Sequence, residues 1–339
     1  MKETILTGIR TNSDLHIGHT LGVLTSMTRL ANKFSDKHHI NIFVPDLHSI
    51  ISEIDGDMQT NIIRSIKYYI ASGLKVNDNI HIYRQSHVPA HSELTWILNC
   101  FTYFGEASRM IQFKEKSEGK GENVNLGILD YPVLMAADII LYSAKYVPVG
   151  EDQFQHIELT RDIATRFNNR FGYEVFTLPV TTKEQAKFMG VEEGIRIRDL
   201  INPEKKMSKS TVAANSKIMV SDTPDEAAKK IMSATTDSLA HIDFDMFNQP
   251  GISNLLQILA LITDEPLDVV TAEWAGQSNY GDLKRAVAEA VREYLTDFQA
   301  KYSAISDQQA IDLFETGEKY ANEVANAKLL EVQKLVGLR

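Results

Sequence analysis

The sequence predicts an α/β protein in which a doubly wound parallel sheet is followed by a C-terminal α-helical domain. Short β-branched runs alternate with helical segments over residues 1–210, which is typical of a parallel sheet with both faces covered. Beyond Thr223 the pattern is almost entirely helical. A length of 339 residues favours two domains and a sizeable core. We therefore expect one domain over residues 1–210 and a second over residues 211–339.

The expected elements follow from apolar periodicity and from the glycines that interrupt it. Strands are expected at residues 3–7, 40–44, 80–83, 146–149 and 174–178. Helices are expected at residues 16–30, 59–72, 92–110, 161–171, 252–262 and 311–335. Apolar side chains recur every four residues at Leu283, Val287, Val291 and Leu295, which predicts the buried face of a further helix. Charge and glycine between residues 113 and 122 predict a mobile, exposed loop.

The composition is that of an ordinary soluble globular protein, with 43% hydrophobic and 24% charged residues. No window approaches the roughly 18 consecutive apolar residues of a membrane span, and the strand-like residues directly after Met1 predict no secretory signal. Cys100 is the single cysteine, so an intrachain disulfide is impossible and a thiolate metal site is not expected. The net charge of −10 argues against non-specific coating of nucleic acid. We expect a cytoplasmic protein without membrane contact.

The first strand is followed by a polar loop and a helix start that carries two histidines. His16 and His19 are three residues apart and share a face of the expected helix, with Gly18 between them. Glycine lets a flat ring or a phosphate approach the backbone closely, and a helix N-terminus favours anions. These residues therefore suit a polyphosphate whose charge grows in a transition state. The alternative is a pair of surface histidines on an amphipathic helix.

The central stretch, residues 131–162, combines a carboxylate in an apolar run with a polar strand end. Asp138 lies within the apolar residues 133–142, where a carboxylate is costly to bury unless hydrogen bonds are donated to it. A β-branched run then ends at Gly150, followed by Glu151 and Asp152. Open α/β sheets bind ligands at such strand ends. The alternative is that Asp138 caps a helix or is a core carboxylate whose hydrogen bonds come from within the protein.

A lysine-rich run follows the last expected strand of the α/β unit. Lys206, Ser208, Lys209 and Ser210 place two ammonium groups on a segment with small residues between them. Such a segment can swing both ammonium groups onto a polyphosphate. The alternative is a solvated lysine-rich face.

These motifs resemble the two signatures of class I aminoacyl-tRNA synthetases. His16-Ile17-Gly18-His19 is similar to the first signature, and Lys206-Met207-Ser208-Lys209-Ser210 matches the second letter for letter. They occur in order, about 190 residues apart, in a Rossmann-like pattern. Within this class the chain resembles the bacterial tryptophanyl-tRNA synthetases along essentially its whole length. The closer resemblance rests on residues 112–117, 134–138, 147–153 and 250–256.

The resemblance implies a reaction and the residues that serve it. The family joins ATP and tryptophan into tryptophanyl-adenylate with release of pyrophosphate, and then transfers tryptophan to tRNA. Catalytic roles are implied for His16, His19, Lys206 and Lys209. ATP contacts are implied for Arg10, Thr11, Asn12, Gly18, His19, Gly150, Glu151, Asp152, Ile197, Lys206, Met207, Ser208, Lys209 and Ser210. Among these, Gly150, Glu151 and Asp152 would hold the ribose, and Ile197 and Met207 would contact the adenine through their backbone. An L-tryptophan pocket is implied for Leu6, His48, Tyr131, Met135, Asp138, Val147, Val149 and Gln153. Mg²⁺ would arrive with ATP, and no metal bound by the protein itself is implied.

The resemblance also implies partners. Residues 1–210 would be the catalytic domain, with an insertion at about residues 75–130 that forms the interface of a homodimer. Residues 211–339 would hold the anticodon end of tRNA(Trp). This segment carries eleven Lys and Arg against twenty Asp and Glu, so RNA contact would use a few placed residues, such as Lys284, Arg285 or Arg292. Each of these three also suits a solvated helix face.

The sequence departs from many bacterial relatives at Arg10, Thr11, His19 and Thr211, which bears on the nucleotide contacts. Three other functions remain open at this point. A tyrosyl-tRNA synthetase shares both signatures, although residues 134–138 argue against it. A small nucleotidyltransferase carries the first signature but lacks residues 206–210 and the helical domain. A synthetase-like paralogue would bind RNA or a regulatory partner without charging tRNA.

Overall fold

A computed structural model describes residues 2–8, 14–51, 57–119, 121–189, 196–208 and 211–339. Its centre is a sheet of four parallel strands in the order β3-β2-β1-β4. The strands are β1 (Glu3–Gly8), β2 (His38–Val44), β3 (Ile80–Arg84) and β4 (Ala144–Tyr146). In the register of β1 and β2, Leu6 lies opposite Asn41. The strand order reverses direction at β1, and this confirms the expected doubly wound α/β fold.

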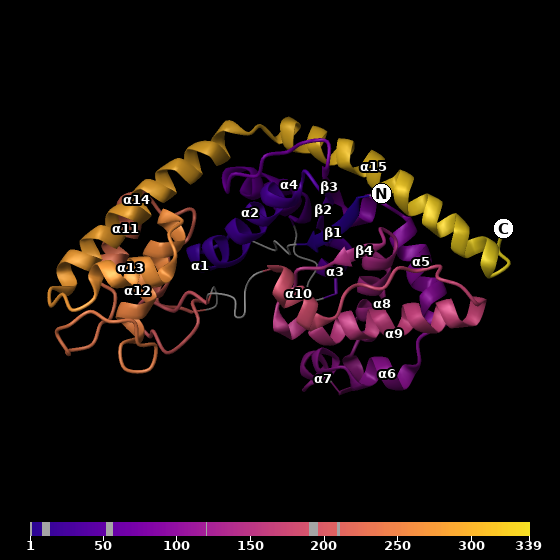
Figure 1. The fold of residues 1–339 in the computed structure, drawn as a ribbon, viewed down its shortest axis with the longest axis horizontal. Coiled ribbons are helices and arrows are strands. Elements are labelled where there is room, and N and C mark those ends of the chain that lie inside the picture. The colour runs from indigo at the N-terminus through magenta and orange to yellow at the C-terminus, as the bar shows by residue number, and fades with distance from the viewer. Residues whose placement is uncertain (1, 9–13, 52–56, 120, 190–195, 209–210) are drawn as a thin grey trace.

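Helices cover the sheet and form a separate cluster at one end of the molecule (Figure 1). Those of the α/β part are α1 (Ile17–His19), α2 (Thr25–Phe34), α3 (Asp46–Ser49), α4 (Met58–Ala71), α5 (Ala90–Asn99), α6 (Phe104–Arg109), α7 (Ile111–Ser117), α8 (Leu126–Ile140), α9 (Phe154–Phe171) and α10 (Thr182–Met189). The following helices are α11 (Pro224–Met232), α12 (Pro250–Thr263), α13 (Leu267–Trp274), α14 (Tyr280–Ala304) and α15 (Asp307–Leu335). The expected C-terminal helical region is therefore confirmed, whereas the exact boundary at residues 210 and 211 stays a prediction.

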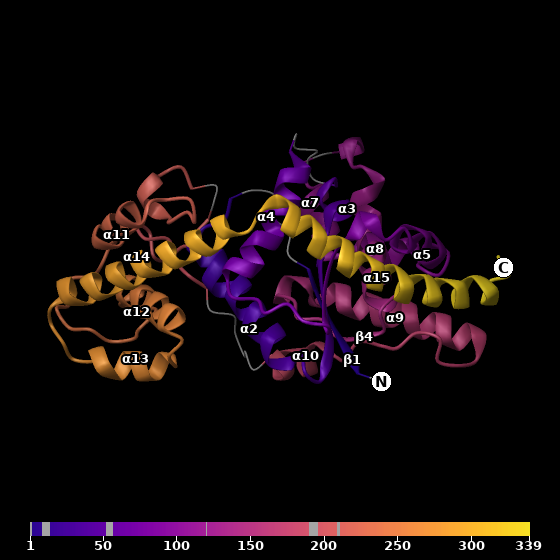
Figure 2. The same cartoon turned by 90° about the horizontal axis from the view of Figure 1, so that it is seen from above.

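Helix α15 returns from the helical cluster to the sheet and packs along β3 (Figures 1 and 2). A Cβ atom on Gly317 would lie 2.0 Å from the carbonyl oxygen of Ile82, so only glycine allows this close approach of helix and strand. Next to it, the Arg84 guanidinium donates from Nη2 to Glu318 Oε2 at 2.9 Å, with both side chains largely buried. The C-terminal helix is thus fixed to the edge of the sheet.

Four sequence expectations are wrong in detail. The strand expected at residues 146–149 is instead β4 (Ala144–Tyr146), and beyond it the Val147 N–H donates to the Gln185 side chain rather than to a neighbouring strand. Residues 174–178 do not form a strand, because the Asn168 side chain of α9 accepts from the backbone N–H groups of Val175 and Phe176 and donates to the Phe176 carbonyl. The helix expected at residues 92–110 is divided into α5 and α6 by a turn at residues 100–103. The loop expected from residue 113 starts later, since α7 extends to Ser117.

Apolar side chains bury three clusters, two around the sheet and one in the helical part. The third cluster contains the expected helix face at Leu283, Val287, Val291 and Leu295, all fully buried. It also contains Ile17 of α1, so the segment after β1 packs against the C-terminal helices. In the part of the chain that the structure describes, no helix has both the length and the apolar character to cross a membrane.

Candidate active site

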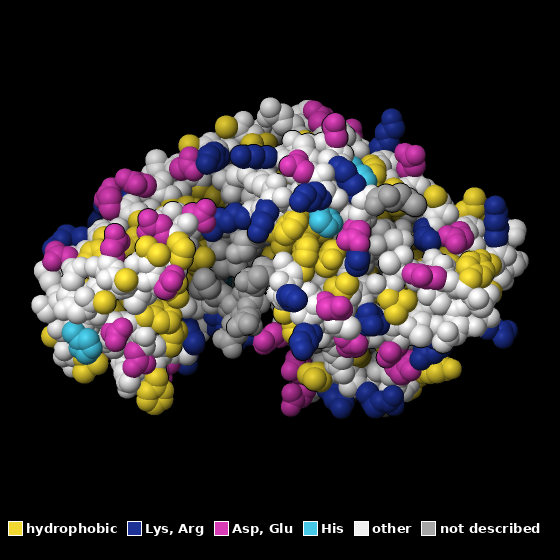
Figure 3. All heavy atoms as spheres, viewed as in Figure 1, with side chains coloured by type: hydrophobic (Ala, Val, Ile, Leu, Met, Phe, Trp, Pro, Cys, Tyr) yellow, Lys and Arg dark blue, Asp and Glu magenta, His cyan; other side chains and the backbone are white. Residues whose placement is uncertain are grey.

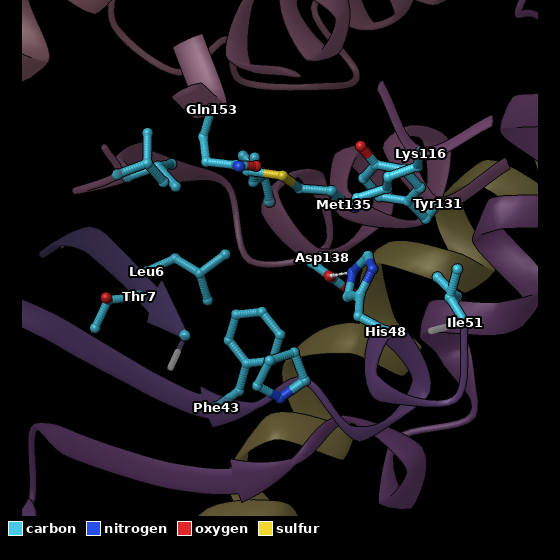
Figure 4. A pocket seen from close by; sticks show the side chains of 15 residues that line it. Leu6, Thr7, Phe43, His48, Ile51, Lys116, Tyr131, Met135, Asp138 and Gln153 are labelled. Carbon is cyan, nitrogen blue, oxygen red and sulfur yellow. Dashed lines mark hydrogen bonds and ion pairs between the residues drawn. The ribbon is translucent and has the colours of Figure 1, made fainter. Parts of the chain in front are cut away.

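A pocket of about 260 Å³ opens at the carboxyl ends of the strands, where the strand order reverses. All eight side chains of the expected tryptophan pocket line it together (Figure 4): Leu6, His48, Tyr131, Met135, Asp138, Val147, Val149 and Gln153. The remaining lining residues, which the sequence did not single out for this pocket, are Thr7, Gly8, Phe43, Pro45, Ile51, Lys116 and Ile139. The pocket is smaller than the roughly 300–1,000 Å³ of a site for a drug-sized ligand, so it suits one amino acid.

Asp138 of α8 is a buried carboxylate whose oxygens accept several hydrogen bonds. His48 Nε2 lies 2.9 Å from Oδ2, and Gln85 Nε2 lies 2.8 Å from Oδ1. His91 Nδ1 lies 2.6 Å from Oδ1. Burial alone would raise the pKa of the Asp138 carboxyl, but the hydrogen bond from His48, together with the electrostatic interaction and the hydrogen bond with His91, outweighs it and lowers the pKa to about 2. Asp138 is therefore an ionised acceptor at neutral pH.

A second polar group of the pocket, Tyr131, is held by His156 of α9. The Tyr131 hydroxyl lies 3.0 Å from His156 Nε2, and His156 is fully buried. Burial and the positive charge of Lys116 lower the pKa of His156 to about 4, so its ring is neutral at pH 7. The ammonium group of Lys116 lies 4.1 Å from the centre of the Tyr131 ring. The Lys116 charge is therefore placed at the pocket, although the sequence predicted a solvated loop at residues 113–122, with contact of Lys116 with phosphate as the alternative.

The first signature forms a short turn of helix closed by its own histidine. His16 is the N-cap of α1, and its Nδ1 accepts from the backbone N–H of His19 at 3.2 Å. A neutral His16 ring therefore carries its proton on Nε2. A Cβ atom on Gly18 would lie 3.2 Å from Ile197 Cβ, so this glycine lets the two segments approach. The Ile17 N–H also donates to the Ile218 carbonyl at 2.9 Å.

The described part of the second signature pairs with the segment that holds Ile197. The Met207 N–H donates to the Ile197 carbonyl at 3.0 Å, and Arg198 and Lys206 form an antiparallel bridge. The Asn254 side chain of α12 binds the backbone N–H and carbonyl of Arg198. Gly18, Ile197 and Met207, all expected at the nucleotide, are thus in one place.

His19 and Lys206 link the two signatures electrostatically. Burial and the positive charge of Lys206 both lower the pKa of His19, which keeps the imidazole neutral at pH 7. The buried Nε2 atom of His19 has no hydrogen-bond partner among the residues that the structure describes. A buried polar atom without a partner is costly, so this atom suits a contact with a ligand.

The expected ribose-binding segment lies at the other side of the pocket opening. Glu151, Asp152 and Gln153 form one helical turn after Gly150, and the Gln153 amide donates to Asp152 Oδ2 at 2.7 Å. Glu151 lies 3.9 Å from the Arg196 guanidinium, next to Ile197, although both side chains are about two-thirds exposed. This weak pair places the segment near the adenine-binding residues expected from the sequence.

Several expected residues lie outside the described residues: Arg10, Thr11, Asn12, Lys209 and Ser210. Ser208 is half-buried and lies directly after Met207. Sequence reasoning missed Gln85, His91 and His156 as functional residues, although Gln85 does follow an expected strand. Over the described stretches, no three His, Cys, Asp or Glu residues are grouped so as to hold a metal ion.

A protein-family model shows the class to which the chain belongs. The family model described as tRNA synthetases class I (W and Y) matches residues 2–296. The chain therefore belongs to this family of class I tRNA synthetases, as the resemblance of its signatures implied.

Individual proteins that are similar to this chain point to one amino-acid specificity within the family. A tryptophan–tRNA ligase of Caldanaerobacter subterraneus is 44% identical over 335 residues and covers 98% of both chains. The crystal structure of tryptophanyl-tRNA synthetase from Mycoplasma pneumoniae superposes with a TM-score of 0.80 at 34% identity, over 100% of this chain and 99% of the other. That of Campylobacter jejuni, complexed with ADP and tryptophan, has a TM-score of 0.77 at 29% identity, over 99% and 100%. Within the family, the chain is thus similar over its full length to tryptophan–tRNA ligases.

Proposed function

We propose that this enzyme is a tryptophan–tRNA ligase, which activates L-tryptophan with ATP and transfers it to tRNA(Trp). The observation that carries the proposal is the pocket around Asp138, because it gathers eight side chains from separate elements around one ionised acceptor. Indole nitrogen is only a donor, so a pocket that selects tryptophan over phenylalanine needs such an acceptor. The full-length similarity to tryptophan–tRNA ligases supports the same assignment.

The first step joins tryptophan and ATP without a nucleophile from the protein. A carboxylate oxygen of tryptophan attacks the α-phosphorus, the bond from that phosphorus to the bridging oxygen of the β-phosphate breaks, and pyrophosphate leaves. The protein contributes orientation and stabilises the growing phosphate charge. Lys206 and Lys209 are proposed for the leaving pyrophosphate, and His16 and His19 for hydrogen bonds to the phosphates. Mg²⁺ is proposed to arrive bound to ATP.

The nucleotide is proposed to lie across the two signature segments. Gly18, Ile197 and Met207 would contact the adenosine, and Gly150, Glu151 and Asp152 the ribose. The contact of Gly18 with Ile197 and the hydrogen bond from Met207 to Ile197 support a single adenine-binding strip. Arg10, Thr11, Asn12, Ser208, Lys209 and Ser210 complete the proposed ATP site.

In the second step, a ribose hydroxyl at the tRNA end attacks the activated carbonyl carbon, and AMP leaves. We assign the anticodon end of the tRNA to residues 211–339. On the face of these helices that Figure 3 shows, Lys and Arg side chains are interspersed with Asp and Glu. A few individual Lys or Arg side chains, rather than a broadly basic surface, would therefore contact the RNA. Of the three candidates, Lys284 donates to the Ala234 carbonyl, whereas Arg285 and Arg292 form ion pairs with carboxylates of the same chain.

A homodimer is proposed through the segment at about residues 75–130. Large apolar side chains of this segment are exposed, among them Leu126 at 81% and Phe104 at 72%, together with Trp96 and Tyr103. An apolar surface of this kind suits burial against a second copy. Sedimentation equilibrium should give a dimer, and Leu126→Asp should give a monomer. Phe247→Asp, at a phenylalanine of the helical part that is 90% exposed, is the control that should stay dimeric.

Charging of tRNA tests the proposed function directly. Purified enzyme, ATP, Mg²⁺ and labelled tryptophan should give label on tRNA(Trp) that alkali releases. The same mixture with labelled tyrosine and tRNA(Tyr) is the control for the tyrosyl alternative. Label on tRNA(Tyr), or activation of tryptophan without transfer to any tRNA, would contradict the proposal. Cytoplasmic location is proposed with this function, and fractionation of cells with antibody detection checks it.

A further inference from the structure

The Asp138 carboxylate is held from two sides by two different histidines. His48 approaches from the pocket, which it lines, and its Nε2 bonds Oδ2 (Figure 4). His91, near the start of α5, approaches from behind and bonds Oδ1 at 2.6 Å. The His91 side chain is fully buried and does not belong to the pocket lining. A ligand can therefore displace His48 from Oδ2 without touching His91.

The position of the ring proton on His91 follows from the two groups that its nitrogens contact, Asp138 and Tyr142. Asp138 is ionised and accepts only, so His91 Nδ1 carries the proton of that 2.6 Å hydrogen bond. The other ring nitrogen, Nε2, lies 3.0 Å from the Tyr142 hydroxyl. Burial raises the pKa of Tyr142, so the hydroxyl keeps its proton and can donate it to Nε2, which leaves the ring proton on Nδ1. Tyr142 thereby favours the tautomer that donates to Asp138.

The His91 ring has little freedom to move. It stacks on Phe43 at 6.4 Å between ring centres, and it also lies within 6.2 Å of the Tyr83 ring and 5.6 Å of the Tyr142 ring. Phe43 in turn lines the pocket, whereas Tyr83 and Tyr142 are buried behind it. A donor clamped in this way fixes the orientation of the carboxylate as well as its charge.

We infer that His91 is a positioning residue for amino-acid selection, which, with its tautomer set by Tyr142, keeps Asp138 an ionised acceptor for a ring N–H. The inference deepens the proposed function and rests on it. When a ligand displaces His48, the donors left on Asp138 are His91 and the Gln85 amide, which bonds Oδ1 at 2.8 Å and Oδ2 at 2.9 Å. Loss of the His91 donor then leaves only the amide to oppose burial, which favours the protonated acid. A protonated Asp138 has an O–H donor of its own, so the pocket would lose its preference for a substrate N–H over an isosteric group that cannot donate.

The experiment compares tryptophan with its benzothienyl analogue, in which sulfur replaces the ring NH. ATP–pyrophosphate exchange gives kcat/KM for both substrates, and their ratio measures the preference for the N–H. In His91→Leu this ratio should fall about tenfold or more, mainly through a higher KM for tryptophan, because a hydrogen bond to a charged group is weakened. His91→Asn places an amide donor near the position of Nδ1 and should retain most of the preference. Tyr142→Phe should lower the ratio by a smaller factor.

Tyr69→Phe is the matched control, because Tyr69 is another fully buried tyrosine, on α4 and outside the pocket lining. It should leave the ratio unchanged. An unaltered ratio in folded His91→Leu would overturn the inference, and if that variant fails to fold, an unaltered ratio in Tyr142→Phe would do so. Exchange by the wild type with tryptophan tests the proposed function separately, so the two failures are distinguishable.

Discussion

The amino-acid pocket around Asp138 and the two signature segments around His19 and Lys206, here called the phosphate side of the site, differ in whether their polar groups already have hydrogen-bond partners. In the pocket, Asp138 already accepts hydrogen bonds from His48, Gln85 and His91. On the phosphate side, the buried Nε2 of His19 has no partner within the described residues, and the nearby Lys206 charge lowers the pKa of His19. The acceptor of the pocket is thus hydrogen-bonded before a ligand binds, although Gln85 Oε1 and His156 Nδ1 nearby have no partner within the described residues, and the phosphate side contains an atom that a phosphate would satisfy.

This difference matches the two tasks of the proposed reaction. Selection of a side chain needs a fixed acceptor, and fixed hydrogen-bond partners supply it before the substrate binds. Stabilisation of a transition state needs donors that form their best contacts only when charge develops. We therefore expect changes in the pocket to alter mainly KM and selectivity, and changes on the phosphate side to alter mainly kcat.

The largest expected effect is on the phosphate side. Lys206→Ala should lower kcat of adenylate formation by about 10²–10³-fold, as for loss of one transition-state donor, with little change in the KM for tryptophan. Lys209→Ala should behave alike. The exposed neighbour Lys205 is the matched control, and Lys205→Ala should retain kcat. Pyrophosphate exchange at saturating substrates gives the comparison. A Lys206 variant with near-normal kcat would indicate that the lysine-rich segment is only a solvated surface without a role in catalysis.

The next effect is on the pocket. Asp138→Ala should weaken tryptophan binding by about ten- to over a hundredfold, which corresponds to roughly 1.5–3 kcal/mol for a hydrogen bond to a charged acceptor. It should also abolish most of the preference for tryptophan over its benzothienyl analogue. Asp162→Ala, at an exposed acid of α9, serves as control. If Asp138 only stabilises the helix, the variant would melt earlier and keep its preference for the N–H.

A third prediction separates the charge of Asp138 from its shape. The pKa of Asp138 is lowered from 3.8 to about 2, so its ionised form stabilises the folded state by about 2 kcal/mol above pH 4. This contribution should be lost as the pH falls from about 4 to 2. Denaturant unfolding of wild type and Asp138→Asn at several pH values measures it. The difference in unfolding free energy should shrink at acid pH, and a difference independent of pH would contradict the account.

The smallest effect on activity is expected at the ion pair that links the segment after Gly150 to the segment that holds Ile197. The Arg196 and Glu151 side chains are 3.9 Å apart and about two-thirds exposed, and such surface pairs contribute little. Arg196→Ala should therefore change the KM for ATP by less than about threefold. A much larger increase would mean that Arg196 itself contacts the nucleotide.

The sequence predicted the parallel sheet, the helical C-terminal region and eight of the fifteen residues that line the pocket, because apolar periodicity and a matching family pattern mark them. His91, Gln85 and His156 were missed because each is a single polar residue without a local pattern. Their contacts with Asp138 and Tyr131 arise only when α5, α9 and the helical turn after β3 pack against α8. The strand wrongly expected at residues 174–178 has a more local cause, since the side chain of Asn168, near the end of the preceding helix α9, forms hydrogen bonds with the backbone there.

The most direct test of the central claim is ATP–pyrophosphate exchange with each of the twenty amino acids in turn. The account predicts exchange that depends on tryptophan, because the pocket offers a fixed acceptor for the indole N–H and the signature segments offer charge for the phosphates. The other nineteen amino acids should give no exchange above the level without amino acid. Exchange driven by tyrosine, or no exchange with any amino acid, would contradict the account.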